Sequence, residues 1–286
     1  MNGIELTCFE WGSPGADTVL LAHATGFHAR VWDRTIAALA PGRHAIALDM
    51  RGHGRSSKTG PYTWDVFGED VAQAVQVLGL ERVIGVGHSM GGHAMTQAAA
   101  RLPERFVRLV LVDPVIMSPE IYADRARHVM PARAGDHPTS KRKNDWVSWE
   151  EMLQRFEKRH PFDLWRRDVL KDYCRGGVLP NPDGPGFVLA CPPHVEAQIY
   201  TGSAGRDINA MIRSITMPVT VLRARAREGA RTEAMDFAAS PTWAGLAHAF
   251  PSGRDVPLPE LTHFIPMQEP ELVARFIEHP EASLER

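Results

Sequence analysis

The stretch Val83-Ile84-Gly85-Val86-Gly87-His88-Ser89-Met90-Gly91-Gly92 joins an apolar run to small, helix-forming residues through the pattern Gly-x-Ser-x-Gly. The apolar run predicts a buried strand, and residues 90–101 predict a helix. Gly87 and Gly91 lack the Cβ atoms that would collide in a sharp strand-to-helix turn, so Ser89 can adopt a strained backbone with its hydroxyl exposed. We therefore expect Ser89 to act as a nucleophile at the N-terminus of this helix.

Short apolar runs on either side of this turn predict further strands. The runs at 19–22, 45–48 and 107–112 are typical of strands covered on both faces, and helical patterns separate them. Strands that alternate with helices predict a parallel sheet with helices on both faces. Residues 4–11 instead alternate apolar and polar side chains, which indicates an antiparallel edge strand.

The pattern changes after residue 117, where helical pieces and loops replace buried strands. Ser148 and Glu151 form a capping box that predicts a helix through Phe156. Strand character returns at 219–222, and a short strand and a closing helix end the chain. We therefore expect an α/β core and one inserted helical segment, which we call the cap. The expected boundaries are 1–117 and 214–286 for the core and 118–213 for the cap.

Composition narrows the possible partners and location. The chain has 286 residues, 44% hydrophobic content and a net charge of −2, and no long basic run suggests a nucleic-acid or membrane partner. The three cysteines are far apart and form no Cys-x-x-Cys pattern, so neither a disulfide framework nor a zinc site is expected. No stretch reaches the roughly 20 apolar residues of a membrane span. We expect a cytoplasmic protein without metal or cofactor, and leave its oligomeric state open.

Four motifs together resemble the α/β-hydrolase family. They are Gly-His-Ser-Met-Gly-Gly at 87–92, His-Ala-Thr-Gly-Phe at 23–27, Asp-Met-Arg-Gly-His-Gly-Arg-Ser at 49–56 and Thr-His-Phe at 262–264. The resemblance covers both core segments. It implies an α/β-hydrolase fold, with a mostly parallel central sheet, helices on both faces and a helical cap. It also implies that the 49–56 segment has a structural role and supports the nucleophile turn.

A serine nucleophile needs a base and a third group that orients the base. His263 is the expected base, since it lies between the last core strand and the final helix, in the chain order that the family shows. The acid departs from the usual family pattern, because Arg223-Ala224-Arg225 follows the later strand where an Asp is common. Asp113, at the end of the 107–112 strand, and Glu228 are both candidates. Asp236, or no acid at all, is the remaining alternative.

The resemblance implies an oxyanion hole made by two backbone N–H groups. The expected donors are Met90, directly after the nucleophile, and Thr25, in the 23–27 loop. Such donors stabilise charge that appears only in the tetrahedral intermediate.

Aromatic residues gather in the cap. Trp149, Leu153 and Phe156 share one helical face, so these rings can form the interior of the cap, a roof over Ser89, or both. We expect the substrate pocket to include four aromatic residues: Phe27, Trp146, Trp149 and Trp165.

The predicted function is hydrolysis of small or medium carboxylic esters through an acyl-enzyme, with an apolar small-molecule substrate. The same residues could also hydrolyse a lactone, a thioester or a carbon–carbon bond. A ligand-binding member of the fold with little turnover is a third hypothesis. Haloalkane dehalogenase and epoxide hydrolase chemistry is disfavoured, because those relatives attack with Asp where this chain has Ser89.

Overall fold

Among the described residues, seven strands form the central sheet, in the order β1-β3-β2-β4-β5-β9-β10. The computed structural model describes residues 2–128, 133–202, 207–229 and 236–284. β1 pairs with β3 in antiparallel fashion, as expected for the edge strand, and the other pairs are parallel. The strand bounds are β1 Cys8–Trp11, β2 Thr18–Ala22, β3 Ala45–Leu48, β4 Val83–His88, β5 Phe106–Val112, β9 Val219–Ala224 and β10 Gly253–Leu258.

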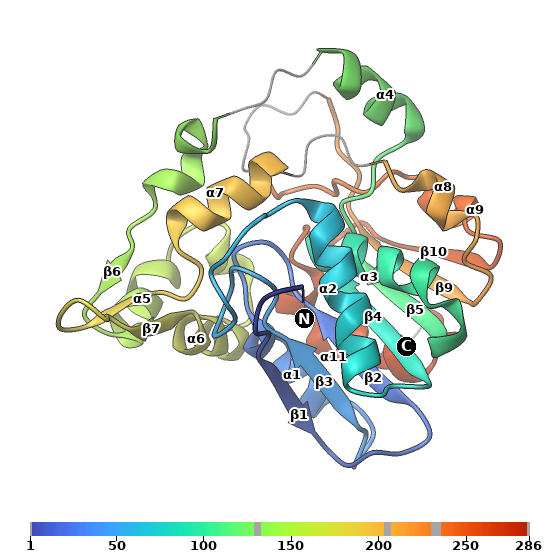
Figure 1. Cartoon of the computed structure of the whole chain (residues 1–286), viewed down its shortest axis with the longest axis horizontal. Helices are drawn as coiled ribbons and strands as arrows, with labels where there is room; N and C mark the ends of the chain where they lie inside the picture. Colours follow the sequence, from blue (N-terminus) through green and yellow to red (C-terminus); the bar gives the residue numbers. More distant parts are fainter. Residues whose placement is uncertain (1, 129–132, 203–206, 230–235, 285–286) are drawn as a thin grey trace.

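Helices cover both faces of this sheet (Figure 1). Alternate residues of β2 divide between two apolar clusters, as the two-residue period of a strand requires. Val19 and Leu21 pack with residues of α11 (Pro270–Glu278), beside α1 (Asp33–Ala37). Leu20 and Ala22 pack with residues of α2 (Trp64–Val77) and α3 (Met90–Arg101). The buried strands and the helices beside them therefore follow the predicted pattern.

The remaining helices outside the cap are short. The helical segment between β2 and β3 consists of a 3-10 turn and α1, which ends at Ala37. No described helix is both long and apolar enough to cross a membrane. The short helices of the described core are η1 Ala29–Trp32, η2 Pro103–Arg105, α9 Leu246–Ala249 and α10 Ile265–Gln268.

The cap contains a small antiparallel sheet in addition to the expected helices. β6, β8 and β7 form a three-stranded antiparallel sheet. These strands have only two or three residues each, too few for the sequence to show a two-residue period. The bounds in the cap are α4 Pro119–His128, η3 Ala134–Asp136, η4 Pro138–Lys141, β6 Asp145–Trp146, α5 Trp149–Phe156, η5 Phe162–Leu164, α6 Arg167–Gly176, β7 Val178–Pro180, β8 Phe187–Leu189, α7 Pro193–Gly202 and α8 Asn209–Ile212.

The predicted capping box is present at the start of α5. Ser148 Oγ accepts a hydrogen bond from the Glu151 N–H at 3.3 Å. The Glu151 side chain accepts from the Val147 N–H at 2.9 Å, one residue before the position expected. α5 ends at Phe156, as predicted. The described strands of the main sheet all lie outside 118–213, and the division into core and cap at these boundaries stays a prediction.

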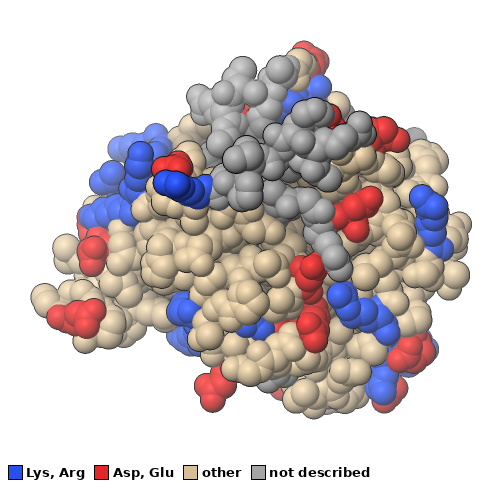
Figure 2. Space-filling view, turned by 45° about the horizontal axis from the view of Figure 1, so that its top comes forward, with Lys and Arg blue, Asp and Glu red and all other residues tan. Residues whose placement is uncertain are grey.

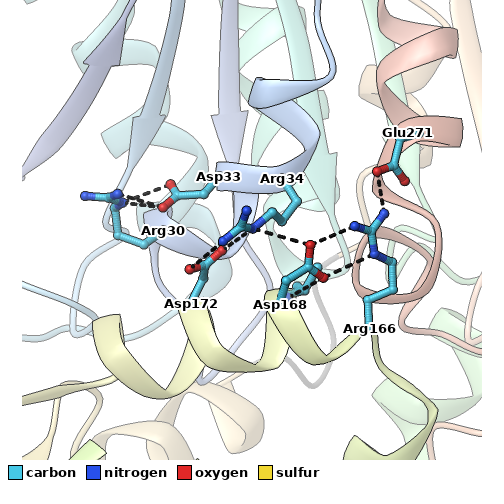
Figure 3. Close-up of polar contacts among 8 residues, drawn as sticks. Arg30, Asp33, Arg34, Arg166, Asp168, Asp172 and Glu271 are labelled. Atoms are coloured by element: carbon cyan, nitrogen blue, oxygen red, sulfur yellow. Dashed lines mark hydrogen bonds and ion pairs between the residues drawn. The ribbon is translucent and has the colours of Figure 1, made fainter.

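A row of ion pairs joins α6 of the cap to the core (Figure 3). Arg34 of α1 lies 2.6 Å from Asp172 and 3.7 Å from Asp168. Arg166 pairs with Asp168 at 2.7 Å and also with Glu271 of α11. The arginines are more than a third exposed, so each pair contributes less than about 1 kcal/mol. The row links α6 to α1 and α11 and adds little to the stability of the fold.

The molecular face in Figure 2 shows both basic and acidic side chains, separated by wide areas of other residues. Charges of both signs are interspersed over this face, in keeping with the small net charge of −2.

Candidate active site

Ser89 stands in a strained turn between β4 and α3. Its backbone has φ 57° and ψ −117°, a conformation that costs roughly 1–3 kcal/mol for a residue with a Cβ. A Cβ on Gly87 would lie 2.4 Å from the Gly91 carbonyl oxygen, and one on Gly91 would lie 2.2 Å from that of Ala22. The prediction that these two glycines permit the turn is therefore confirmed. The Ser89 N–H donates to the carbonyl of Val112 at 3.1 Å, which ties the turn to the adjacent strand.

The structure brings Ser89, His263 and Asp113 into one chain of hydrogen bonds. His263 Nε2 lies 3.0 Å from Ser89 Oγ, and His263 Nδ1 lies 2.7 Å from Asp113 Oδ2. Ser89 is 7% exposed, and the other two are more deeply buried. With the His263 Nδ1–H donating to Asp113 Oδ2, the Nε2 atom carries the lone pair that faces the Ser89 hydroxyl. In this arrangement His263 can accept the hydroxyl proton.

Asp113 is completely buried at the carboxyl end of β5. Its Oδ1 accepts from the Ala224 N–H at 3.0 Å, from Ser240 Oγ at 2.5 Å and from Thr242 Oγ1 at 3.2 Å. These donors and His263 satisfy the lone pairs that burial would otherwise leave without partners. The carboxylate is therefore fixed from β5, from the end of β9 and from the segment before α9.

The alternative acids lie elsewhere. Glu228 is exposed, and Asp236 forms an ion pair with Arg227. Of the carboxylates considered from the sequence, Asp113 is the one that bonds to His263 Nδ1. Glu228 is thus not the partner of His263 in this structure.

Two residues that the sequence analysis did not single out hold His263 in place. His88 Nε2 lies 2.8 Å from the carbonyl oxygen of His263 and donates to it. The ring of Phe237 stacks on the His263 ring at 5.7 Å, and its carbonyl accepts from the His263 N–H at 3.2 Å. Burial, and then the nearby His263, lower the pKa of His88 well below its usual value, so His88 is neutral near pH 7. His88 stands inside the Gly-x-Ser-x-Gly motif, and this position is the sequence feature that could have indicated its role.

The two expected oxyanion donors lie side by side. Met90 is the first residue of α3, where backbone N–H groups have no carbonyl partner within the helix. Thr25 is buried, and its hydroxyl donates to the sulfur atom of Met90 at 3.4 Å. Met90 directly follows Ser89, and the contact between the Thr25 hydroxyl and the Met90 sulfur atom places Thr25 beside the first residue of α3.

Two buried histidines brace the 23–27 loop. His23 Nδ1 donates to the Ala24 carbonyl at 2.7 Å, while its Nε2 accepts from the Met50 N–H at 2.9 Å. His53 Nε2 accepts from the Gly26 N–H at 2.9 Å. Burial lowers the pKa of His23 to about 4 and that of His53 well below its usual value, so both are neutral acceptors at pH 7. The 49–56 segment thus supports the 23–27 loop, a contact that differs from the expected support of the nucleophile turn.

Two of the four predicted pocket residues, Phe27 and Trp165, belong to a group of packed aromatic rings that reaches His263 through Phe264. The Phe27 ring is 6.1 Å from His88 and 5.5 Å from Trp165. Trp165 lies 5.1 Å from Phe264, the residue directly after His263. Phe264 joins this aromatic wall without having been predicted, although it stands within the Thr-His-Phe motif.

The other two predicted pocket residues pack within the cap. Trp146 lies 5.7 Å from Phe156, and Lys143 lies over the Trp146 ring. Trp149 is partly buried against the apolar cluster that contains Trp146 and Phe156, and Lys171 lies over its ring. The described ring contacts of Trp146 and Trp149 are with residues of the cap, and their place in the substrate pocket stays a prediction. No group of three or more metal-binding side chains occurs in the described parts of the chain.

Comparison with known proteins identifies the family. A family model described as alpha/beta hydrolase fold matches residues 17–160, half of the chain. The chain therefore belongs to the α/β-hydrolase family.

Curated relatives and a solved structure agree with this assignment. Lipase LipV of Mycobacterium tuberculosis (strain ATCC 25618 / H37Rv) is 34% identical over 129 residues, covering 45% of this chain and 48% of the relative. Bifunctional esterase/perhydrolase DCH of Acinetobacter calcoaceticus is 30% identical over 129 residues, covering 43% and 47%. The match thus spans about half the length of each relative. The crystal structure of E-2-(acetamidomethylene)succinate hydrolase shares the fold, with a TM-score of 0.72, 22% identity and coverage of 96% and 94%.

Proposed function

We propose that this protein is a serine hydrolase that cleaves small or medium carboxylic esters through an acyl-enzyme. The observation that carries the proposal is the hydrogen-bonded chain from Ser89 through His263 to Asp113. The relatives named as a lipase and as an esterase/perhydrolase support the ester class. In this proposal Ser89 is the nucleophile, His263 the general base and acid, and Asp113 the group that orients His263.

The proposed reaction has two halves. As Ser89 Oγ bonds to the ester carbonyl carbon, His263 Nε2 takes the hydroxyl proton and then gives it to the departing alcohol. Water, deprotonated by His263, next attacks the acyl-enzyme, and the carboxylic acid leaves as Ser89 regains its proton. The backbone N–H groups of Met90 and Thr25 receive the carbonyl oxygen in both tetrahedral intermediates, each donor contributing about 3 kcal/mol.

The proposed substrate has an apolar acyl or alcohol group. Phe27, Trp165 and Phe264 place a wall of aromatic rings beside His263. Such a wall favours an aliphatic or aromatic group over a charged one, since burying an unpaired charge is costly. We further propose a cytoplasmic location, supported by the three free cysteines.

The test compares wild type with Ser89→Ala on a series of p-nitrophenyl esters of increasing acyl length. The expected result is turnover by wild type and a loss of at least about 10⁴-fold in the variant. Ser214→Ala changes an exposed serine and serves as the matched control, with turnover within twofold of wild type. A fluorophosphonate probe should label wild type and the control but not the Ser89 variant.

An unlabelled wild-type protein that still bound small esters would contradict the proposal and favour a ligand-binding function. A wild type that hydrolysed lactones or thioesters but no simple esters would retain the Ser89 mechanism and overturn the ester class.

A further inference from the structure

Glu196 is a buried carboxylate of the cap that touches the 23–27 loop. It lies in α7, and only 2% of the residue is exposed. A Cβ on Gly26 would come within 2.6 Å of Glu196 Oε1 and 2.9 Å of its carboxyl carbon. Gly26 directly follows Thr25, so this side chain packs against the backbone next to the proposed second oxyanion donor.

A core residue, His53, also contacts Gly26. The Gly26 N–H donates to His53 Nε2 at 2.9 Å. Gly26 has φ +80°, a left-handed conformation that glycine adopts without the steric cost of a Cβ. A glycine is the most mobile residue in a loop, and here it is confined between a core histidine and a cap carboxylate.

A cationic side chain anchors Glu196. Arg142 forms an ion pair with the Glu196 carboxylate, and its other terminal nitrogen donates to Tyr173 Oη at 3.3 Å. The Tyr173 ring lies 5.2 Å from Phe27, in the aromatic wall of the site. Burial raises the pKa of Glu196, and Arg142 offsets part of that rise. The pair leaves little net charge beside the oxyanion hole, where an unpaired carboxylate would oppose the developing negative charge.

We propose that Glu196 is a positioning residue for the reaction. Its carboxyl group packs against Gly26 and keeps the neighbouring Thr25 N–H directed at the oxyanion. The length and shape of the Glu196 side chain, and not its charge, determine this positioning. Arg142 holds the Glu196 side chain in place. This inference rests on the proposed serine hydrolase function.

Two substitutions separate reach from charge. Glu196→Gln keeps the length of the side chain and an oxygen for Arg142, but removes the charge. Glu196→Asp keeps the charge and withdraws the carboxylate from Gly26 by one methylene. Asp172→Asn is the matched control, because it removes a cap carboxylate that pairs with Arg34 of α1 instead.

The first readout is ester hydrolysis. We expect Glu196→Asp to lower kcat by about tenfold with little change in KM, a fraction of the 10²–10³ that loss of a whole oxyanion donor costs. We expect Glu196→Gln and Asp172→Asn to stay within about threefold of wild type. A larger loss in Glu196→Gln than in Glu196→Asp would overturn the proposal, since charge rather than reach would then control the rate.

The second readout does not depend on turnover. Hydrogen–deuterium exchange of peptides that cover residues 24–28 should increase in Glu196→Asp and stay unchanged in Glu196→Gln and Asp172→Asn. Unchanged exchange in Glu196→Asp would overturn the positioning role, whatever the ester assay shows. If exchange increased while wild type showed no Ser89-dependent turnover, the proposed function would be overturned, and with it any role of the contact in catalysis.

Discussion

Two buried carboxylates flank the site, and the protein holds them in opposite ways. Asp113, in the core, is surrounded by hydroxyl, amide and imidazole donors. Glu196, in the cap, is paired with the arginine side chain of Arg142. Several donors from separate segments hold the Asp113 carboxylate at one position with directional bonds, whereas one long cation holds Glu196 by a contact that a single substitution removes. The comparison predicts that the core determines the chemistry and the cap adjusts it.

The largest expected effect comes from removing the charge of Asp113. In Asp113→Asn the side chain keeps its size, but the amide no longer favours the tautomer of His263 that accepts the Ser89 proton. We expect kcat for ester hydrolysis to fall by about 10⁴-fold. Glu228→Gln, at an exposed position, should leave kcat unchanged. A comparable loss in the Glu228 variant would show that the wrong carboxylate has been assigned.

The second effect concerns the cap carboxylate and the stability of the fold. Arg142→Met leaves Glu196 buried without its cation, and we expect the free energy of unfolding at pH 7 to fall by about 3 kcal/mol. In the double variant Arg142→Met/Glu196→Gln no charge is left unpaired, so most of the loss should disappear. Urea unfolding of wild type, Arg142→Met, Glu196→Gln and the double variant gives the coupling free energy between Arg142 and Glu196. Additive losses would contradict the ion pair as the structure shows it.

The third effect is a pH dependence of stability that originates in the 23–27 loop. His23 has a pKa of about 4 when folded and about 6.5 when unfolded, so the unfolded chain binds the additional proton between these values. The free energy of unfolding should therefore fall as the pH drops from 6.5 toward 4, by about 1.4 kcal/mol per unit from this group. Urea unfolding at pH 6.5 and pH 5 should show a smaller difference in His23→Asn than in wild type. Equal differences in the two proteins would contradict a buried neutral His23.

The smallest effect is expected at the exposed ion pairs of Figure 3. Asp172→Asn removes the negative charge that pairs with Arg34, whose side chain is 39% exposed. We expect the free energy of unfolding to fall by less than about 1 kcal/mol, and less still in high salt. Thermal unfolding at two salt concentrations provides the measurement. A fall in the free energy of unfolding as large as that of Arg142→Met would contradict the expectation that the pair with the buried Glu196 contributes more than the exposed Arg34–Asp172 pair.

Local sequence was sufficient for the parts of the site that belong to short motifs. Ser89 and His263 could be assigned because a turn between two glycines and a histidine before the last helix are recognisable from neighbouring residues. Asp113 could not be separated from Glu228 in this way. Asp113 bonds to a histidine 150 residues away, and the adjacency of β4, β5 and β9 that allows this contact is a property of strand order.

The cap was predicted less well for a related reason. A helical face shows which side of Trp149 is buried, but it does not show which neighbour covers that side. Trp165 and Trp149 are equally aromatic, and only the tertiary fold brings Trp165 to Phe264, where the Arg166 N–H donates to the Met267 carbonyl. The contact of Glu196 with Gly26 joins residues of the cap and of the core, and no sequence pattern indicates it.

In the proposed mechanism Ser89 carries the acyl group during turnover. Wild-type protein mixed with a p-nitrophenyl ester and quenched within the first turnover can be digested and analysed by mass spectrometry. We expect one acyl group on the peptide that contains Ser89. An acyl group on any other residue, or full turnover without any acylated peptide, would contradict this mechanism.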